Sequence, residues 1–316
     1  MDTKRPIIVS AADDAYMEFL DDMLASIQNR LHEYDLGILD LGLSKRSLAM
    51  IRARKEDARV VDPGWRYQPA DMSKQPPYKK VYYAKPYLPD IFPGHVGYMW
   101  IDADVWFQDS SAIEHYISAS EKTPGRGSIA FECHPNYKDI NYKPRFRMVR
   151  KYRILPVAIR LVGRKTFRLV YDMFGDEAAR THGLAPDNNS GLFFIHADSP
   201  AWKAWQHYMR KANHLPFMDR KYFPDQTCLN VALRERNISF HVMQPIYNWI
   251  VGLGLPMLDE NTHALLDPCS PHKKIYAIHL AGSAGFQPSN LRTTSGNHAS
   301  VQLKMSKFYS ETTANQ

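Results

Sequence analysis

The chain has 316 residues, of which 44% are hydrophobic and 12% aromatic. This composition can build a sizeable apolar core and excludes a chain that is disordered as a whole. The formal net charge of +7 favours an anionic partner such as a nucleotide, a nucleic acid or a membrane surface.

The first sixty residues alternate between short apolar runs and amphipathic segments. Apolar runs at 6–12, 35–43 and 58–61 predict strands, and three- and four-residue apolar spacing predicts helices over 16–31 and 44–54, the second capped by Ser44. This order of strand, helix, strand, helix, strand is typical of an α/β fold that opens with parallel pairing.

The rest of the chain continues this mixture of strands and helices. A loop rich in Pro covers 63–77, and a helix over 78–88 is expected to be limited or kinked by Pro86. Further strands are predicted at 97–101, 128–132, 191–196, 239–243 and 275–280, with helices at 201–213 and 225–236. We expect one catalytic domain over 1–288, with a basic helical insertion at about 140–185, and a partly mobile tail over 289–316.

Cysteine usage and hydropathy bear on the compartment. The three cysteines, Cys133, Cys228 and Cys269, are far apart, form no CxxC pair and indicate reduced thiols rather than a zinc site or disulfides. The apolar run near the N-terminus is too short for a signal peptide, and no window reaches the length of a membrane-spanning helix. The expected location is cytoplasmic.

Two carboxylates interrupt an apolar strand in the segment GYMWIDADVWFQD. Asp102 and Asp104 are separated only by Ala103, and burying two unpaired carboxylates side by side is costly. If the strand continued, both side chains would lie on one face, where oxygen ligands suit Mn²⁺ or Mg²⁺. The alternative is a solvated turn that follows the strand and is capped by the two Asp residues.

Residues 143–168 are densely basic and interleaved with apolar side chains. No acidic residue lies between Asp139 and Asp172. Such a stretch could lie on an anionic membrane at the inner face, which suits a lipid-linked acceptor. It could equally be a lid or helical hairpin packed on the core. No nucleic-acid-binding motif is present, so we expect no nucleic-acid partner.

Several segments together resemble the GT-A glycosyltransferases, especially family 8, the retaining group that includes glycogenin and bacterial lipopolysaccharide galactosyltransferases. The similarity covers the chain from Ile7 to about Gly282. The segments, in the order of that family, are IIVSAADDAYMEFLDDMLASI, VYYAKPYLP, MWIDADVWFQD, NNSGLFFI, DQTCLN and IHLAG.

The resemblance implies roles for particular residues. The metal, Mn²⁺ or Mg²⁺, would be held by Asp102, Asp104 and His279. The catalytic pair would be Asp225 and Gln226, which face the sugar. The remaining donor contacts would come from Ala12, Asp13 and Tyr16 (base and ribose), Lys85, Asn189, Ser190, Gly191 and Gly282 (sugar and diphosphate). On residue chemistry alone, His279 could be structural, and Asp225 could be the N-cap of the helix that follows Pro224.

The resemblance implies a metal-dependent transfer of a hexose from a nucleotide-sugar to a hydroxyl of a glycan or lipid-linked glycan. The donor would be UDP-glucose or UDP-galactose, and the anomeric configuration would be retained. Two family positions differ here, since Ala15 replaces an Asn and Gly285 replaces a Lys. Arg292 or a cation of the basic segment could substitute for that lysine. The alternatives are a non-catalytic nucleotide-sugar-binding protein on this scaffold and an inverting GT-A transferase.

Overall fold

The computed structural model describes residues 5–65, 75–132, 165–183, 185–212, 224–281 and 285–313. Most of the basic segment 143–168 and the predicted site residue Gly282 lie outside the described residues. None of the helices in the described ranges is both long and apolar enough to cross a membrane.

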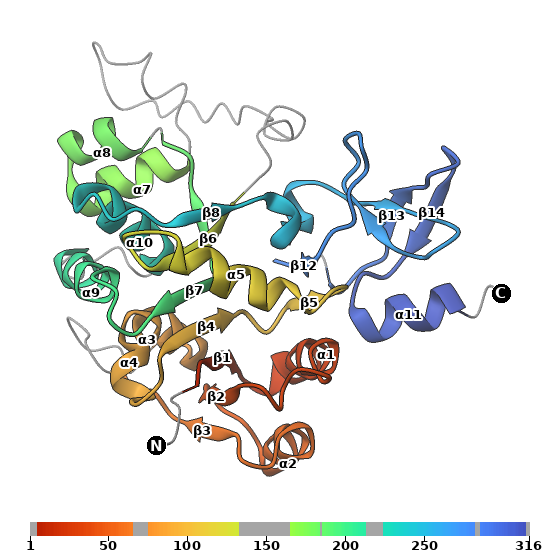
Figure 1. Cartoon of the computed structure of the whole chain (residues 1–316), viewed down its shortest axis with the longest axis horizontal. Helices are drawn as coiled ribbons and strands as arrows, with labels where there is room; N and C mark the ends of the chain where they lie inside the picture. Colours follow the sequence, from red (N-terminus) through yellow and green to blue (C-terminus); the bar gives the residue numbers. More distant parts are fainter. Residues whose placement is uncertain are drawn as a thin grey trace.

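The main sheet has seven strands in the spatial order β3-β2-β1-β4-β7-β6-β8 (Figure 1). Their bounds are β1 (Ile7–Ala12), β2 (Asp35–Asp40), β3 (Arg59–Val61), β4 (Gly97–Ile101), β6 (Gly127–Phe131), β7 (Asn188–His196) and β8 (His241–Met243). Neighbouring strands run parallel except at β7, which is antiparallel to both β4 and β6. The mixed, mostly parallel sheet confirms the predicted α/β class.

Helices cover both faces of this sheet. One face carries α1 (Met17–Ser26), α2 (Lys45–Arg54) and α5 (Ala112–Glu121), and the other carries α3 (Lys80–Ala84), α4 (Leu88–Ile91), α9 (Ala201–Ala212) and α10 (Pro224–Glu235). Beyond these, α7 (Lys165–Phe174) packs on α8 (Asp176–His182) and contacts α9 and α10 (Figure 1). The short 3-10 helices are η1 (Asp14–Tyr16), η2 (Pro77–Lys79), η3 (Lys85–Tyr87), η5 (Pro245–Tyr247) and η6 (Val251–Leu253).

Strand alternation divides the core into two layers. Along β1, Ile7 and Val9 are fully buried among side chains of α3, α4, α9 and α10. Ile8 points the other way and is fully buried among side chains of α1 and α5. Successive strand side chains face opposite sides of a sheet, so an unbroken apolar run such as IIV is what a strand covered on both faces requires.

A second, smaller sheet extends the fold beyond β4. It contains β5 (Val105–Phe107), β12 (Ala277–His279) and β9 (Trp249–Ile250), with β12 in the middle. Two antiparallel pairs follow along the chain, β10 (Met257–Leu258) with β11 (Leu265–Leu266) and β13 (Ser289–Arg292) with β14 (His298–Val301).

Residues 289–313 form ordered elements where the sequence predicts a tail. After β13 and β14, α11 (Met305–Thr313) lies against the domain (Figure 1). Phe308 is fully buried, with its ring 5.8 Å from that of Trp106. Trp106 donates its indole N–H to the Leu303 carbonyl at 2.9 Å, and Asp22 accepts from the Ser306 N–H at 3.1 Å. Burial of large aromatic side chains holds this segment against the domain, although its composition is polar.

Most predicted elements are present, with altered ends. Ser44 caps α2 as expected, since its hydroxyl accepts from the Ser47 N–H at 3.3 Å. The helix predicted over 16–31 ends at Ser26. Ile27 and Leu31 are buried in the turns that follow, so their apolar spacing reflects burial rather than helix.

Around Pro86 the single predicted helix becomes four short ones because proline removes a helical hydrogen bond. The helix α5 was not predicted.

Two of the three cysteines, which the sequence predicts as reduced thiols, lie in the described residues. Cys228 is buried and Cys269 is partly exposed, and neither forms a disulfide with another described residue. Cys133 lies outside the described residues.

Candidate functional site

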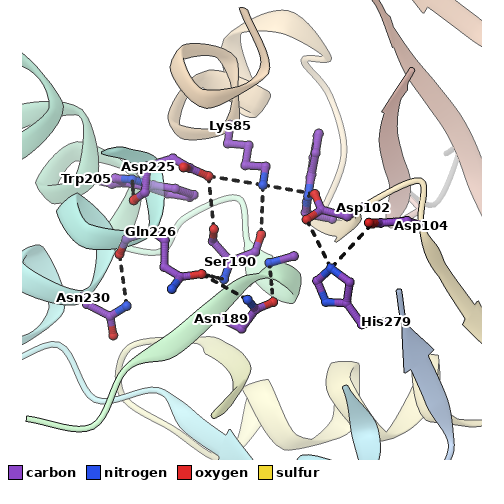
Figure 2. A network of polar contacts seen from close by, with 12 residues as sticks. Lys85, Asp102, Asp104, Asn189, Ser190, Trp205, Asp225, Gln226, Asn230 and His279 are labelled. Carbon is purple, nitrogen blue, oxygen red and sulfur yellow. Dashed lines mark hydrogen bonds and ion pairs between the residues drawn. The ribbon is translucent and has the colours of Figure 1, made fainter. Parts of the chain in front are cut away.

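Asp102 and Asp104 lie in the turn that joins β4 to β5, at the carboxyl end of β4. Their partner is His279, the last residue of β12, which pairs with Val105 of β5. Its Nε2 is 3.5 Å from Asp104 Oδ1 and 3.9 Å from Asp102 Oδ2 (Figure 2). The chain thus brings together three side chains whose possible ligand atoms all lie within 4.8 Å of one another.

The backbone at these acids differs from the predicted strand. β4 ends at Ile101 and β5 begins at Val105, with the Val105 N–H bonded to the Asp102 carbonyl at 3.0 Å. The alternative of a turn is therefore correct for the backbone. The side chains are not freely solvated, however, since they are 30% and 15% exposed for Asp102 and Asp104. In this turn both carboxylates lie beside His279. A continued strand would only have placed the two side chains on the same face.

A second group of charges adjoins the first. The Lys85 ammonium lies 3.1 Å from Asp102 Oδ1 and 3.2 Å from Asp225 Oδ2, and it donates to the Ser190 carbonyl at 3.2 Å (Figure 2). It also sits 4.7 Å from the centre of the Trp100 ring. Lys85 is 3% exposed and has three N–H donors, all of which have an acceptor here. The donor contact implied for Lys85 would therefore require exchange of one of these acceptors.

Burial and charge shift the acidities of this group. Burial raises the pKa of Asp104, although His279 opposes this. Burial also raises the pKa of Asp225, although Lys85 opposes this. Burial acts in the same direction on Asp102, but the charges of Lys85 and His279 outweigh it and lower the pKa of Asp102. Burial would lower the pKa of Lys85, but Asp102 and Asp225 raise it overall.

Gly191 allows the close approach on which this geometry depends. A Cβ at Gly191 would stand 2.5 Å from His279 Cε1 and 2.6 Å from Asp102 Oδ2, distances at which atoms overlap. The Gly191 carbonyl accepts from the Asp102 N–H at 2.8 Å. β7 therefore needs a glycine where it passes the acids.

The remaining predicted sugar-side residues adjoin this group at the start of β7 and of α10. Asp225 is 1% exposed, and its Oδ2 accepts from the Ser190 hydroxyl at 3.1 Å. Among the described residues, Asp225 Oδ1 has no hydrogen-bond partner. Gln226 Oε1 accepts from Asn189 Nδ2 at 3.1 Å and from the Ser190 N–H at 3.2 Å. α10 begins at Pro224, so Asp225 lies inside its first turn and is not the N-cap. Its carboxylate takes part in the charge group instead.

The predicted nucleotide-side residues lie at the carboxyl end of β1, beside β4. β1 and β4 are parallel neighbours, so Ala12 and the acid turn share one edge of the sheet. Asp13 accepts from the Tyr16 N–H at 3.1 Å. Burial and then the negative charges of Asp104, Asp13 and Asp102 raise the pKa of Tyr16, which puts its hydroxyl within electrostatic reach of the acids. In α/β sheets, ligands bind at this edge.

Two sequence positions that differ from the family behave differently in the structure. Gly285 is buried, and a Cβ there would be 2.6 Å from the ring of Phe19, so a lysine would not fit without movement of that ring. Ala15 is exposed after β1, and Arg292 is exposed on β13. Gly282, the remaining predicted contact, lies outside the described residues.

Two residues of the site are not predicted from the sequence. Trp100 donates its indole N–H to Asp102 Oδ1 at 2.7 Å. Asn248 is 1% exposed and bonds both to His279 Nδ1, at 3.0 Å, and to Asn189 Oδ1, at 2.9 Å. In the sequence, Asn248 is a polar residue directly before the apolar pair Trp249–Ile250, which places it beside an apolar segment but does not indicate its bonds to His279 and Asn189.

The charge balance and donor set suit a divalent metal. Asp102, Asp104 and Asp225 carry three negative charges when ionised, and Lys85 offsets one of them. Two carboxylates and an imidazole fit Mn²⁺, while Mg²⁺ prefers oxygen ligands. Two negative charges are left without a counter-charge, and burying such charges is costly. This edge of the sheet is therefore well suited to hold a cation.

Comparison with known proteins identifies the fold. The sequence matches no protein-family model and no curated protein. Among solved structures, it is similar to the galactosyltransferase LgtC in complex with donor and acceptor sugar analogues, at 15% identity and a TM-score of 0.51, covering 98% of this chain and 95% of that one.

Two further solved structures give the same result. Mouse xyloside xylosyltransferase 1 has a TM-score of 0.51 at 15% identity, covering 87% of this chain and 97% of that one. The glycosyltransferase GlyE of Streptococcus pneumoniae TIGR4 has a TM-score of 0.51 at 11% identity, covering 98% of this chain and 60% of that one. These similarities show that the chain has the GT-A fold indicated by its motifs.

Proposed function

We propose that this protein is a metal-dependent glycosyltransferase that moves a hexose from a nucleotide-sugar to a hydroxyl group of a glycan or lipid-linked glycan. The observation that carries the proposal is the convergence of Asp102, Asp104 and His279 beside the charge group of Lys85 and Asp225, on a GT-A sheet. UDP-glucose and UDP-galactose are the donors we propose, from the resemblance to family 8.

In this proposal Asp102, Asp104 and His279 hold the cation, which supplies Lewis-acid stabilisation of the charge on the departing diphosphate. Mn²⁺ and Mg²⁺ both remain candidates. Lys85 favours the ionised form of Asp102 and fixes its Oδ1, so that Oδ2 remains turned toward His279. Tyr16, Asp13 and Ala12 border the nucleotide, and Gly282 borders the diphosphate.

The sugar side of the proposed site favours retention by front-side attack. Gln226 is an amide and a poor nucleophile. Asp225 is 1% exposed, and its Oδ2 is held by Lys85 and Ser190. Its Oδ1 has no hydrogen-bond partner among the described residues, but that atom is buried, so neither side chain presents an exposed nucleophile to a sugar. In the proposal, Asn189, Ser190 and Gly191 border the sugar, and the acceptor hydroxyl reacts by being held close to the anomeric carbon.

Donor turnover tests the proposal directly. The purified chain is incubated with UDP-glucose, UDP-galactose and GDP-mannose, each with Mn²⁺, with Mg²⁺ or with EDTA, and released nucleotide is measured. We expect release from a UDP-hexose with metal and none with EDTA. Equal release with EDTA would contradict the metal role, and absence of both release and UDP binding would contradict the proposal.

A non-catalytic nucleotide-sugar-binding protein is the second candidate. The buried Gly285 favours it, since the chain has no side chain there to hold a diphosphate. In the same assay, this candidate predicts metal-dependent binding of UDP by calorimetry without release of nucleotide from any donor. An inverting transferase would be recognised by NMR of the product, from the opposite anomeric configuration.

The membrane contact of residues 143–168 also remains a proposal. Among its described residues, Arg168 pairs with Asp172 at 3.6 Å, and α7 buries Val170 and Met173 in the core. This packing favours a lid or packed hairpin for the end of the segment. Flotation with anionic vesicles would test the rest: a variant with reversed charges in 143–164 should lose flotation, and equal flotation would contradict the membrane contact.

A further inference from the structure

We propose that Asn248 is a positioning residue that fixes which ring nitrogen of His279 can bind metal. Through Asn189 it also fixes which atom of the Gln226 amide faces the sugar. Asn248 joins the two halves of the site, since it contacts both His279 Nδ1 and Asn189 Oδ1. The proposal rests on the proposed function, in which His279 holds the metal and Gln226 faces the sugar.

Two backbone N–H groups define the direction of this chain of side-chain amides. The Ser190 N–H donates to Gln226 at 3.2 Å, and the Gly191 N–H donates to Asn189 at 2.9 Å. A backbone N–H can only donate. The atoms that accept from them must therefore be the amide oxygens, Gln226 Oε1 and Asn189 Oδ1, which removes the usual ambiguity between amide oxygen and nitrogen.

The direction then propagates from one side chain to the next. With its oxygen fixed, Asn189 must turn Nδ2 toward Gln226 Oε1, at 3.1 Å. The Asn248 atom that faces Asn189 Oδ1, at 2.9 Å, must donate and is therefore Nδ2. This leaves Asn248 Oδ1 facing His279 Nδ1 at 3.0 Å. A hydrogen bond between these two atoms requires the proton on Nδ1.

The consequence for His279 is a single available ligand atom. With Nδ1 protonated, the lone pair for a metal can come only from Nε2, which is the nitrogen that faces Asp104 and Asp102. Metal-binding histidines generally donate their other ring N–H to a neighbouring acceptor, which sets the tautomer and the ring orientation. Here the acceptor is an amide that is itself held in direction by the backbone of β7.

The consequence for Gln226 concerns its role toward the sugar. Its Oε1 already accepts two hydrogen bonds, from Asn189 and from the Ser190 N–H. In the described part of the chain, its Nε2 has no hydrogen-bond partner, and the residue is partly exposed. Gln226 therefore offers N–H donors to the substrate, where they can stabilise a departing or hydroxyl oxygen, and its carbonyl oxygen is not free to attack.

Two substitutions of Asn248 separate its hydrogen bond to His279 from its hydrogen bond to Asn189. In Asn248→Asp, a carboxylate can still accept from His279 Nδ1–H but cannot donate to Asn189. In Asn248→Ala, both bonds are lost. Binding of Mn²⁺ alone is followed by the electron paramagnetic resonance signal of the free ion. We expect Asn248→Ala to weaken Mn²⁺ binding by about 10- to 100-fold and Asn248→Asp to change it by less than about threefold while kcat falls.

Asn230 supplies the matched control for the loss of a buried amide. It is 2% exposed and donates to the Gln226 and Asn188 carbonyls, without contacting His279 or the Gln226 side-chain amide. Asn230→Ala should lower thermal stability about as much as Asn248→Ala and leave Mn²⁺ affinity unchanged. Equal loss of Mn²⁺ affinity in both variants would show a general effect of packing and overturn the proposal.

A measurement on the unmodified protein keeps the proposal testable if Asn248→Ala fails to fold. The ¹⁵N shifts of selectively labelled histidine, assigned with His279→Gln, distinguish the two tautomers in the metal-free protein at alkaline pH. We expect the proton on Nδ1 of His279, and a proton on Nε2 alone would overturn the proposal. If the native protein shows the Nδ1 proton but binds neither Mn²⁺ nor Mg²⁺, the proposed function is wrong, while the role of Asn248 in fixing the His279 tautomer is confirmed.

Discussion

The two charge groups of the site differ in how the protein satisfies them. Around Lys85, opposite charges lie within 3.2 Å, and Ser190 supplies further hydrogen bonds. Around His279, two carboxylates stand 3.5 and 3.9 Å from an imidazole nitrogen, and the pKa of Asp104 is raised mainly by burial. In the first group a buried ammonium pairs with both acids, whereas in the proposed function the second group would gain its counter-charge from a bound metal.

This difference separates stability from function within one site. Removing a member of the first group leaves a buried charge without its partner, which destabilises the fold. Removing an acid from the second group relieves repulsion in the metal-free protein and removes a ligand from the metal-bound one. The substitutions below should therefore affect the free energy of unfolding and the activity in different proportions.

The largest effect is expected for Asp104→Asn. Donor turnover should fall by at least about 1,000-fold, equivalent to about 4 kcal/mol in the activation free energy, because a metal ligand is lost. Burial raises the pKa of Asp104 above its unfolded value, so at neutral pH its ionised form disfavours folding. The melting temperature in EDTA should thus stay equal or rise, and a marked fall would contradict this assignment.

Lys85→Met should show the opposite pattern, with stability affected first. Lys85 and Asp225 are 3% and 1% exposed, and breaking a buried pair by removing one partner costs about 3–5 kcal/mol of the free energy of unfolding. Thermal denaturation in EDTA measures the loss. The double variant Lys85→Met with Asp225→Asn should recover part of it, and additive losses would show that the two charges are not coupled.

Gln226→Glu tests the sugar side without altering size. The carboxylate can still accept from the Ser190 N–H and Asn189, but it cannot donate to the substrate. We expect kcat to fall by about 100-fold, a typical cost of losing one donor to a developing charge, while Mn²⁺ affinity and the melting temperature remain close to native. Unchanged kcat would show that the amide N–H has no role.

Gly191→Ala should have the smallest effect of the four. The added Cβ would overlap His279 Cε1 at 2.5 Å and Asp102 Oδ2 at 2.6 Å, so the ligands must shift, and we expect Mn²⁺ affinity to fall by about tenfold. Gly252→Ala is the control, since the nearest atom to its Cβ would be 3.4 Å away. Equal Mn²⁺ affinity in both variants would show that the site tolerates movement of β7.

The sequence predicts those parts of the structure that depend on local pattern. The apolar run IIV of β1, the stripe of α1 and the Ser44 cap of α2 each follow from neighbouring residues. Asp102 and Asp104 are conspicuous because two acids interrupt an apolar run. The ordered motifs around them indicate the GT-A fold that structural comparison shows, while the roles of the individual site residues stay predictions.

Features that depend on distant partners could not be predicted. The acids converge through a turn rather than a continued strand because His279, on β12, lies opposite. Asn248 has no local signal of its bonds to Asn189 and His279, which come from other strands. The segment 289–313 reads as a polar tail, yet Phe308 is buried against Trp106 from β5. In each case, packing across the fold determines the outcome.

Locating the metal tests the proposed site most directly. A crystal grown with Mn²⁺ and UDP is measured near the manganese absorption edge, and anomalous difference density marks the ion. We expect one strong peak within coordinating distance of Asp102, Asp104 and His279 Nε2. A peak elsewhere, or none at this cluster while UDP is bound, would contradict the proposed site.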